Sequence, residues 1–191
     1  MSGSGQRRPS AGPRSSRRSW GWHPLTDSWA RRIVADSGVG PGDLVLDVGA
    51  GAGALTRPLL AREARVVAVE LHAGRHAALT RLAASEPRLT VIRADAADLR
   101  LPRRPFRVVS SPPYAASTAL LGRLLAPGSR LVTGHLVVQR QFAQRWVSGD
   151  APGAGRWHRT WELSIGRPLP RSAFRPPPRV DSVVLEIRRR G

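Results

Sequence analysis

Acidic side chains follow three apolar segments that have the composition of buried strands. Segment 44–48, LVLDV, runs into a glycine-rich turn, GAGAG (49–53). Glu70 ends the next apolar segment, and Asp95 ends the one after it. Since the carboxyl ends of parallel strands meet at one edge of an open α/β sheet, these groups are expected to line one ligand pocket. The glycines let a ligand approach the main chain, and Glu70 stands where a carboxylate accepts hydrogen bonds from ribose hydroxyls.

Asp47, the acid before the glycines, helps to decide whether the pocket binds a dinucleotide or S-adenosylmethionine. The turn lacks the G-x-G-x-x-G spacing of dinucleotide sites. Asp47 would also repel the pyrophosphate of a dinucleotide. S-adenosylmethionine carries a sulfonium cation and no phosphate, so an acid-lined pocket suits it. The sequence therefore favours S-adenosylmethionine as the cofactor.

Segment 108–117, VVSSPPYAAS, places two prolines directly after an apolar strand. Proline has a fixed φ and no main-chain N–H, so the strand must end there. Tyr114, the only tyrosine of the chain, follows at once. The segment is either a strand exit with a packed tyrosine or a rigid corner of a pocket. In both cases it lies at the same edge of the sheet as the acids.

Strand-like and helical segments alternate along the chain from residue 20 onward, which predicts a Rossmann-like α/β fold with a seven-stranded, mainly parallel sheet. The last two strands are joined by a proline-rich segment without a helix, so the last strand is expected to be antiparallel. The domain is expected to span 20–191, and the arginine-rich arm at 1–19 is expected to be disordered. Strands are expected at 44–48, 65–70, 89–95, 106–111, 131–138, 160–166 and 181–189, and helices after Asp27 and near 53–63, 74–84, 117–125 and 139–146.

The charge of the chain is strongly positive. Its 191 residues include 31 basic residues, all arginine, and 13 acidic ones, for a formal net charge of +18. Arginine binds phosphate in a bidentate manner and stacks on bases, so the surplus predicts a polyanionic partner, with nucleic acid as the first candidate. The chain has no cysteine, no apolar segment long enough to cross a membrane and no secretory signal. We therefore expect a cytoplasmic protein without membrane contacts, and no metal site, since His72 and His76 lack a further ligand.

The motifs together resemble those of amino-group methyltransferases: Asp47–Gly53, Glu70, Asp95-Ala96 and Ser111–Tyr114. Segments 22–34 and 174–187 narrow the resemblance to the Erm and KsgA family of ribosomal RNA adenine dimethyltransferases, over residues 20–190. Segment 157–182 is most similar to actinobacterial Erm proteins. The resemblance implies a class I methyltransferase fold and S-adenosylmethionine-dependent methylation of an adenine amine in 23S rRNA. It also implies resistance to macrolides, lincosamides and streptogramin B.

The resemblance implies a role for each site residue. The Pro112 carbonyl and the Ser111 hydroxyl would accept hydrogen bonds from the adenine amine, and Tyr114 would stack on the flipped base. Ser111 replaces the asparagine that is usual in the Erm family, and His23 replaces a second asparagine. The residues expected to bind the cofactor are His23, Leu25, Gly49, Gly51, Glu70, Asp95, Ala96 and Ser111.

The chain stops directly after the last expected strand, where members of this family carry a helical domain that helps to bind RNA. RNA binding is therefore expected to rest on the catalytic domain and the arm, with 23S rRNA or a ribosomal precursor as partner and the protein a monomer. Two alternatives stay open: a KsgA-like enzyme that acts on 16S rRNA, and an rRNA-binding homologue that has lost catalysis, with Ser111 as the sign of that loss. The expected phosphate contacts are Arg17, Arg18, Arg103, Arg104, Arg107, Arg140 and Arg145.

Overall fold

The computed structural model describes residues 23–190, so the predicted disordered arm at 1–19, with Arg17 and Arg18, lies outside the described residues. The strands are β1 (Leu44–Val48), β2 (Arg65–Val69), β3 (Leu89–Ile92), β4 (Phe106–Ser110), β5 (Leu131–Gln139), β6 (Trp161–Leu169) and β7 (Ser182–Arg189). The α-helices are α1 (Asp27–Asp36), α2 (Thr56–Ala61), α3 (Ala73–Ala83), α4 (Ser117–Leu124) and α5 (Arg140–Ser148). Short 3-10 turns lie at Tyr114–Ala116, Ala154–Arg156 and Arg171–Ala173.

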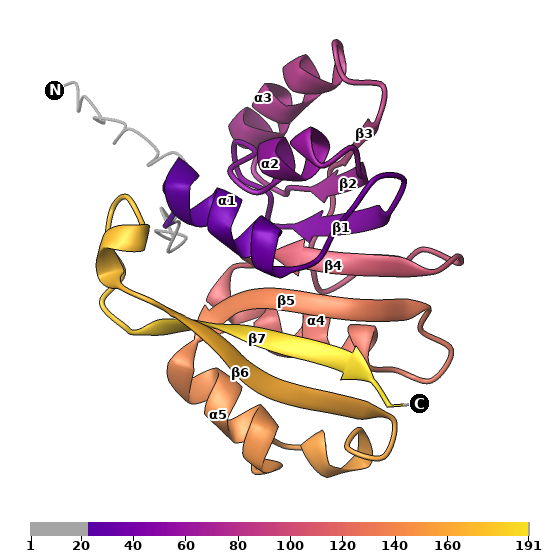
Figure 1. Ribbon diagram of the computed structural model, residues 1–191, viewed down its shortest axis with the longest axis vertical. Helices are drawn as coiled ribbons and strands as arrows, with labels where there is room; N and C mark the ends of the chain where they lie inside the picture. Colours follow the sequence, from indigo (N-terminus) through magenta and orange to yellow (C-terminus); the bar gives the residue numbers. More distant parts are fainter. Residues whose placement is uncertain (1–22, 191) are drawn as a thin grey trace, which may run out of the picture.

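The strands form one seven-stranded sheet in the order β3-β2-β1-β4-β5-β7-β6 (Figure 1). Neighbouring strands from β3 to β5 pair in parallel. β7 is antiparallel to both β5 and β6. The predicted fold, including the antiparallel last strand, is therefore confirmed.

Helices cover both faces of the sheet because the central parallel strands are apolar on both sides. Val45 of β1 packs into the cluster that contains α1, α2 and α3, whereas Leu46 packs into the cluster that contains α4 and α5. The apolar face of α1 explains why this segment is helical, since Ile33 and Val34 are each 1% exposed. Each such side chain contributes roughly 1.5–3 kcal/mol to folding relative to exposure.

The direction of the strands brings separate parts of the chain to one edge of the sheet. The carboxyl ends of β1 to β5 lie together because these strands are parallel. β6 runs in the same direction as β5, since both are antiparallel to β7, so the β6–β7 loop returns to that edge. We call it the carboxyl edge. Among residues 23–190, no helix is long and apolar enough to cross a lipid bilayer.

Candidate cofactor and substrate site

The glycine turn after β1 packs directly against the corner after β4. Gly49 and Gly51 have φ values of +73° and +60°. A Cβ on Gly49 would lie 2.8 Å from Cδ of Pro113 and 3.2 Å from Cα of Pro112. Only glycine fits both this conformation and this close approach. The two motifs, although distant in the sequence, therefore form one continuous surface at the carboxyl edge.

Asp47 places a buried carboxylate beside that surface. Its side chain is 1% exposed, and Oδ2 accepts a 2.7 Å hydrogen bond from Oγ1 of Thr56. Within the described residues, Oδ1 has no hydrogen-bond partner. Burial raises the pKa of Asp47 to about 7. A buried carboxylate oxygen without a partner is costly in the empty protein, and a cationic ligand group beside it would relieve that cost.

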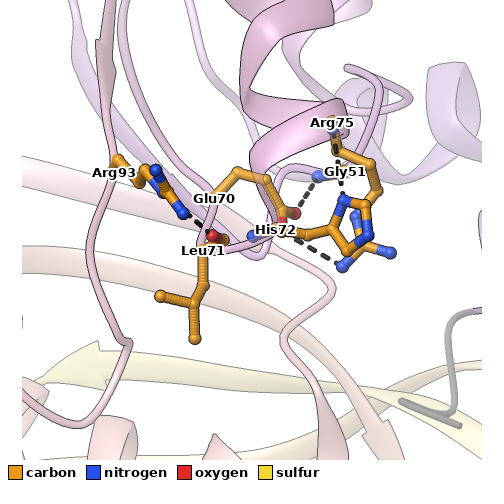
Figure 2. A network of polar contacts seen from close by, with 6 residues as sticks. All are labelled: Gly51, Glu70, Leu71, His72, Arg75 and Arg93. Atoms are coloured by element: carbon orange, nitrogen blue, oxygen red, sulfur yellow. Dashed lines mark hydrogen bonds and ion pairs between the residues drawn. The ribbon is translucent and has the colours of Figure 1, made fainter. Parts of the chain in front are cut away.

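Glu70, directly after β2, is held in one orientation by three donors (Figure 2). Oε2 accepts a 2.9 Å bond from the N–H of Gly51. Oε1 accepts a 2.8 Å bond from the N–H of His72 and a 3.1 Å bond from Nη2 of Arg75. The carboxylate is 4% exposed and links the glycine turn to the start of α3. Its fixed plane fits a group that accepts hydrogen bonds from a ribose.

Asp95, the third predicted carboxylate, lies beyond its strand. β3 ends at Ile92 rather than at Asp95, because its partner strand β2 ends at Val69, directly opposite Ile92. Oδ1 of Asp95 accepts a 2.9 Å bond from the N–H of Ala97. Asp95 and Ala96 border a cavity of about 340 Å³ that also touches Glu70.

The two serines at the end of β4 have different surroundings. Oγ of Ser110 donates to the carbonyl of Val48 at 2.7 Å and accepts its N–H at 3.3 Å, so this side chain joins β4 to β1. Ser111 borders the cavity instead. Within residues 23–190, neither the Ser111 hydroxyl nor the Pro112 carbonyl has a hydrogen-bond partner, so both can accept bonds from a ligand.

Tyr114 follows in a 3-10 turn whose main chain is fixed by the preceding proline. The Pro113 carbonyl accepts bonds from the N–H of Ala116 at 2.9 Å and from Oγ of Ser117 at 3.3 Å. The Tyr114 hydroxyl lies 3.0 Å from Oγ of Ser182, the first residue of β7. The ring is therefore held at both ends while it borders the cavity.

In the wall of the cavity, the first residues of the described chain contact the β6–β7 loop. Leu25 forms an antiparallel bridge with Phe174 in the β6–β7 loop. Nδ1 of His23 donates to the carbonyl of Pro176 at 2.9 Å, which leaves Nε2 as an acceptor when the ring is neutral. Two more main-chain hydrogen bonds join the same segments. Figure 1 shows this loop beside the start of α1.

These parts enclose a cavity of about 750 Å³ at the carboxyl edge. The smaller cavity at Asp95 shares Gly49, Glu70 and Arg75 with it, so the two adjoin. All predicted cofactor and catalytic residues border one of the two cavities. The larger one is bordered by His23, Leu25, Gly49, Gly51, Glu70, Ser111, Pro112 and Tyr114, and the smaller one by Asp95 and Ala96.

Other residues border the larger cavity without belonging to the predicted site. The Arg75 side chain, on α3, donates a hydrogen bond to Glu70. Because Arg75 follows Glu70 by only five residues, the local sequence could have indicated this contact. Phe174 opens the proline-rich segment 174–178, and it is 3% exposed. Asp27 and Arg57 lie in the first turns of α1 and α2, and no pattern in the sequence marks them.

The predicted phosphate contacts divide between the two edges of the sheet. Arg103, Arg104 and Arg107 precede or begin β4, so they lie at the edge opposite the cavity. Arg107 is also engaged, because Nε lies 3.0 Å from Oδ2 of Asp43. Arg140 begins α5 at the carboxyl edge. Arg145 is exposed in the last turn of the same helix. RNA contacts of these residues remain predictions.

The potential metal ligands of the described residues do not form a cluster. Within residues 23–190, no group of three or more histidine, aspartate or glutamate side chains could hold a metal ion. His72 caps α3 instead, since its Nδ1 accepts the N–H of Arg75 at 3.4 Å.

The sequence model described as ribosomal RNA adenine dimethylase matches residues 14–191. The chain belongs to this family. The rRNA adenine N-6-methyltransferase of Bacillus licheniformis is 34% identical over 161 residues, which cover 83% of this chain and 56% of that protein. The ribosomal RNA small subunit methyltransferase A of Leifsonia xyli subsp. xyli is 38% identical over 173 residues, which cover 83% of this chain and 61% of that protein. The chain thus spans a little over half the length of these curated relatives.

Solved structures agree with the family assignment. The crystal structure of the 23S rRNA methyltransferase ErmE superimposes with a TM-score of 0.75 at 30% identity, over 88% of this chain and 70% of that one. The glycopeptide N-methyltransferase MtfA, complexed with S-adenosylmethionine, shares the fold with a TM-score of 0.59 at 18% identity, over 87% of this chain and 88% of that one. The predicted family is therefore confirmed, whereas S-adenosylmethionine as the cofactor of this chain stays a prediction. The unpartnered Oδ1 of Asp47 fits the cationic groups of that cofactor.

Proposed function

We propose that this dimethylase-family protein transfers methyl groups from S-adenosylmethionine to the exocyclic amine of an adenine in 23S rRNA. The observation that carries the proposal is the pair of open acceptors, the Pro112 carbonyl and the Ser111 hydroxyl, on the wall of the cavity. They lie directly against the glycine turn, since a Cβ on Gly49 would touch Pro112 and Pro113. An amine held by these acceptors would thus lie beside the cofactor's turn.

The cofactor, when bound, supplies the electrophilic methyl group of its sulfonium. Asp47 offers a carboxylate oxygen to a cationic group, and Glu70 offers a fixed carboxylate to ribose hydroxyls. Asp95 and Ala96 border the adjoining smaller cavity, which suits the base of the cofactor. Nε2 of His23 adds an acceptor from the opposite wall.

The target amine is activated by hydrogen bonding rather than by a strong base, and the proton that its nitrogen must lose after accepting the methyl group would pass to solvent. The two acceptors, Pro112 and Ser111, hold the N–H bonds of the adenine amine, so its lone pair turns out of conjugation with the ring. The rest of the rate enhancement would come from positioning, because the amine is held where its lone pair can attack the methyl carbon from the side opposite the sulfur. Tyr114, fixed through Ser182, presents its ring as a stacking face for a base that has left its helix.

Two rRNA substrates have support from relatives. The resemblance of segment 157–182 to actinobacterial Erm proteins and the 30% identity with ErmE support 23S rRNA. The 38% identity with a small subunit methyltransferase A supports 16S rRNA as the second candidate. We favour 23S rRNA, in which case the modified ribosome would resist macrolides, lincosamides and streptogramin B.

Methyl transfer to separated rRNAs tests the proposal. The full chain is incubated with labelled S-adenosylmethionine and either 23S or 16S rRNA, and the nucleosides are then analysed. We expect monomethyl- or dimethyladenine in 23S rRNA alone, and loss of label with Tyr114→Ala. Label confined to 16S rRNA would establish the second candidate. A protein that binds the cofactor but labels neither rRNA would be an inactive rRNA-binding homologue.

A further inference from the structure

Three arginines lie on the β6–β7 loop, next to the cavity. Arg171, Arg175 and Arg179 are all exposed, and the Arg171 side chain is 59% exposed. The same loop carries Phe174, which lines the cavity. Because β6 ends and β7 begins at the carboxyl edge, the loop lies at the same edge of the sheet as the cavity.

The loop is fixed before any ligand arrives. Nη2 of Arg171 donates to the carbonyl of Arg179 at 2.9 Å, and Nε lies 3.7 Å from Oδ1 of Asp181. The N–H of Arg175 donates to the carbonyl of Pro24 at 3.0 Å. Three consecutive prolines at 176–178 further restrict the main chain. A ligand that binds here therefore finds the main chain of the loop already ordered.

Two of the loop arginines have no acidic partner. Asp181 is the only acid between Leu169 and Ser182, and Arg171 already lies beside it. Within residues 23–190, neither Arg175 nor Arg179 forms an ion pair. Their guanidinium groups are thus open to phosphate, which arginine binds with two parallel hydrogen bonds.

We propose that Arg175 and Arg179 bind phosphates of the RNA strand on either side of the target adenine. This inference rests on the proposed function and names the surface that places its substrate. Phosphate contacts fix the register of a nucleic acid without reading its sequence. Since the loop is bound to the cavity wall through Phe174 and Pro176, a strand held on the arginines is held at a set distance from Pro112 and Ser111.

The salt dependence of RNA binding tests this surface. The double variant Arg175→Gln with Arg179→Gln is compared with Arg62→Gln with Arg65→Gln. The control pair is also exposed and forms no ion pair in the described part of the chain, but it lies at the opposite edge, where β2 begins. The probe is a labelled RNA hairpin of about 30 nucleotides with an unpaired adenine in its loop, titrated without cofactor at several KCl concentrations.

We expect the slope of log Kd against log salt concentration to fall by about 1.4 in the loop variant, at about 0.7 for each phosphate contact on a single strand. Affinity at about 0.1 M salt should fall roughly tenfold or more. The control pair should leave the slope unchanged. Equal losses in both variants, or no loss in the loop variant, would overturn the inference.

Two further measurements keep the result specific. The melting temperature reports whether the variant is folded, and S-adenosylmethionine binding reports whether the cavity wall is intact. We expect both to be unchanged, because the bond from Arg175 to Pro24 is made by the main chain and persists in the glutamine variant. If the double variant has a lowered melting temperature, the single variant Arg179→Gln is used instead. The Arg179 side chain forms no hydrogen bond in residues 23–190, so this variant should still lose about 0.7 of the slope.

RNA binding through the loop without methyl transfer would refute the proposed function alone. Methyl transfer with wild-type RNA affinity in the double variant would refute the inference alone.

Discussion

Replacing Asp47 by asparagine removes the carboxylate that we expect to face a cationic part of the cofactor. Burial raises the pKa of Asp47 to about 7. A carboxyl group with that pKa is about one-tenth ionised at pH 6 and half ionised at pH 7. Because only the ionised form attracts a cation, the Kd for S-adenosylmethionine should fall about fivefold between these pH values. In Asp47→Asn this dependence should disappear.

The raised pKa also predicts how the stability of the ligand-free protein changes with pH. The ordinary value for this carboxyl is 3.8, so between pH 3.8 and about pH 7 the folded protein retains a proton that the unfolded chain releases. This stabilisation is complete below pH 3.8 and is lost as the pH rises through about 7. The slope approaches about 1.4 kcal/mol per pH unit between the two values. Asp47→Asn should remove this slope from the free energy of unfolding.

Calorimetric titration at pH 6 and pH 7 measures the ligand effect, and urea unfolding over the same range measures the stability effect. S-adenosylhomocysteine lacks the sulfonium charge but keeps the ammonium group. Its pH dependence therefore shows which of these two cations lies beside the Asp47 carboxylate. His23, Arg75 and Glu70 border the same cavity and are unchanged in the variant, so any pH dependence that they cause persists there. Equal pH dependence in the wild type and in Asp47→Asn would refute the reasoning.

Three other changes have defined outcomes. Gly49→Ala should lower the free energy of unfolding by about 1–3 kcal/mol, since the new methyl meets a proline carbon at a positive φ, whereas Gly40→Ala, with open space around it, should be neutral in the same urea titration. Tyr114→Ala should lower kcat/KM by about 10- to 100-fold through lost stacking, and Tyr114→Phe, which only frees the ring from Ser182, by less than about tenfold. A larger loss in the phenylalanine variant would contradict stacking as the role of the ring. Trp161→Phe should lower the melting temperature and cost roughly 1–3 kcal/mol, because the main-chain carbonyl after α4 loses its indole donor; an unchanged melting curve would show that this bond contributes nothing.

The elements of the fold follow closely from local sequence. Buried parallel strands are recognisable as short apolar segments with turn residues at both ends, and each predicted strand is present. β3 is the main difference, because Asp95 was expected to end a strand and instead bonds to the main chain two residues on. The ladder stops opposite Ile92 because β2 ends at Val69, and the local sequence around Asp95 does not show where the partner strand ends.

Site residues that depend on contacts between distant segments were harder to predict. The bond from His23 to Pro176 joins residues 153 positions apart. The ion pair between Arg107 and Asp43 likewise depends on the pairing of β4 with β1, which the local sequence does not specify. Glycines, strand-end acids and prolines are predictable because each acts on its own main chain. The roles of arginines are not predictable in this way, because the position of a long charged side chain depends on the groups that it contacts in the folded protein.

The bridge between Leu25 and Phe174 has a consequence for the order of events during synthesis. The glycine turn, Glu70 and the SPPY corner leave the ribosome before the segment that completes the pocket wall. The residues of the β6–β7 loop that pair with residues 23–26 are therefore synthesised last among the groups that border the cavity. A chain that ends before this loop should therefore lack the Leu25–Phe174 bridge and the part of the cavity wall that it forms, and we expect it to bind S-adenosylmethionine more weakly than the full chain.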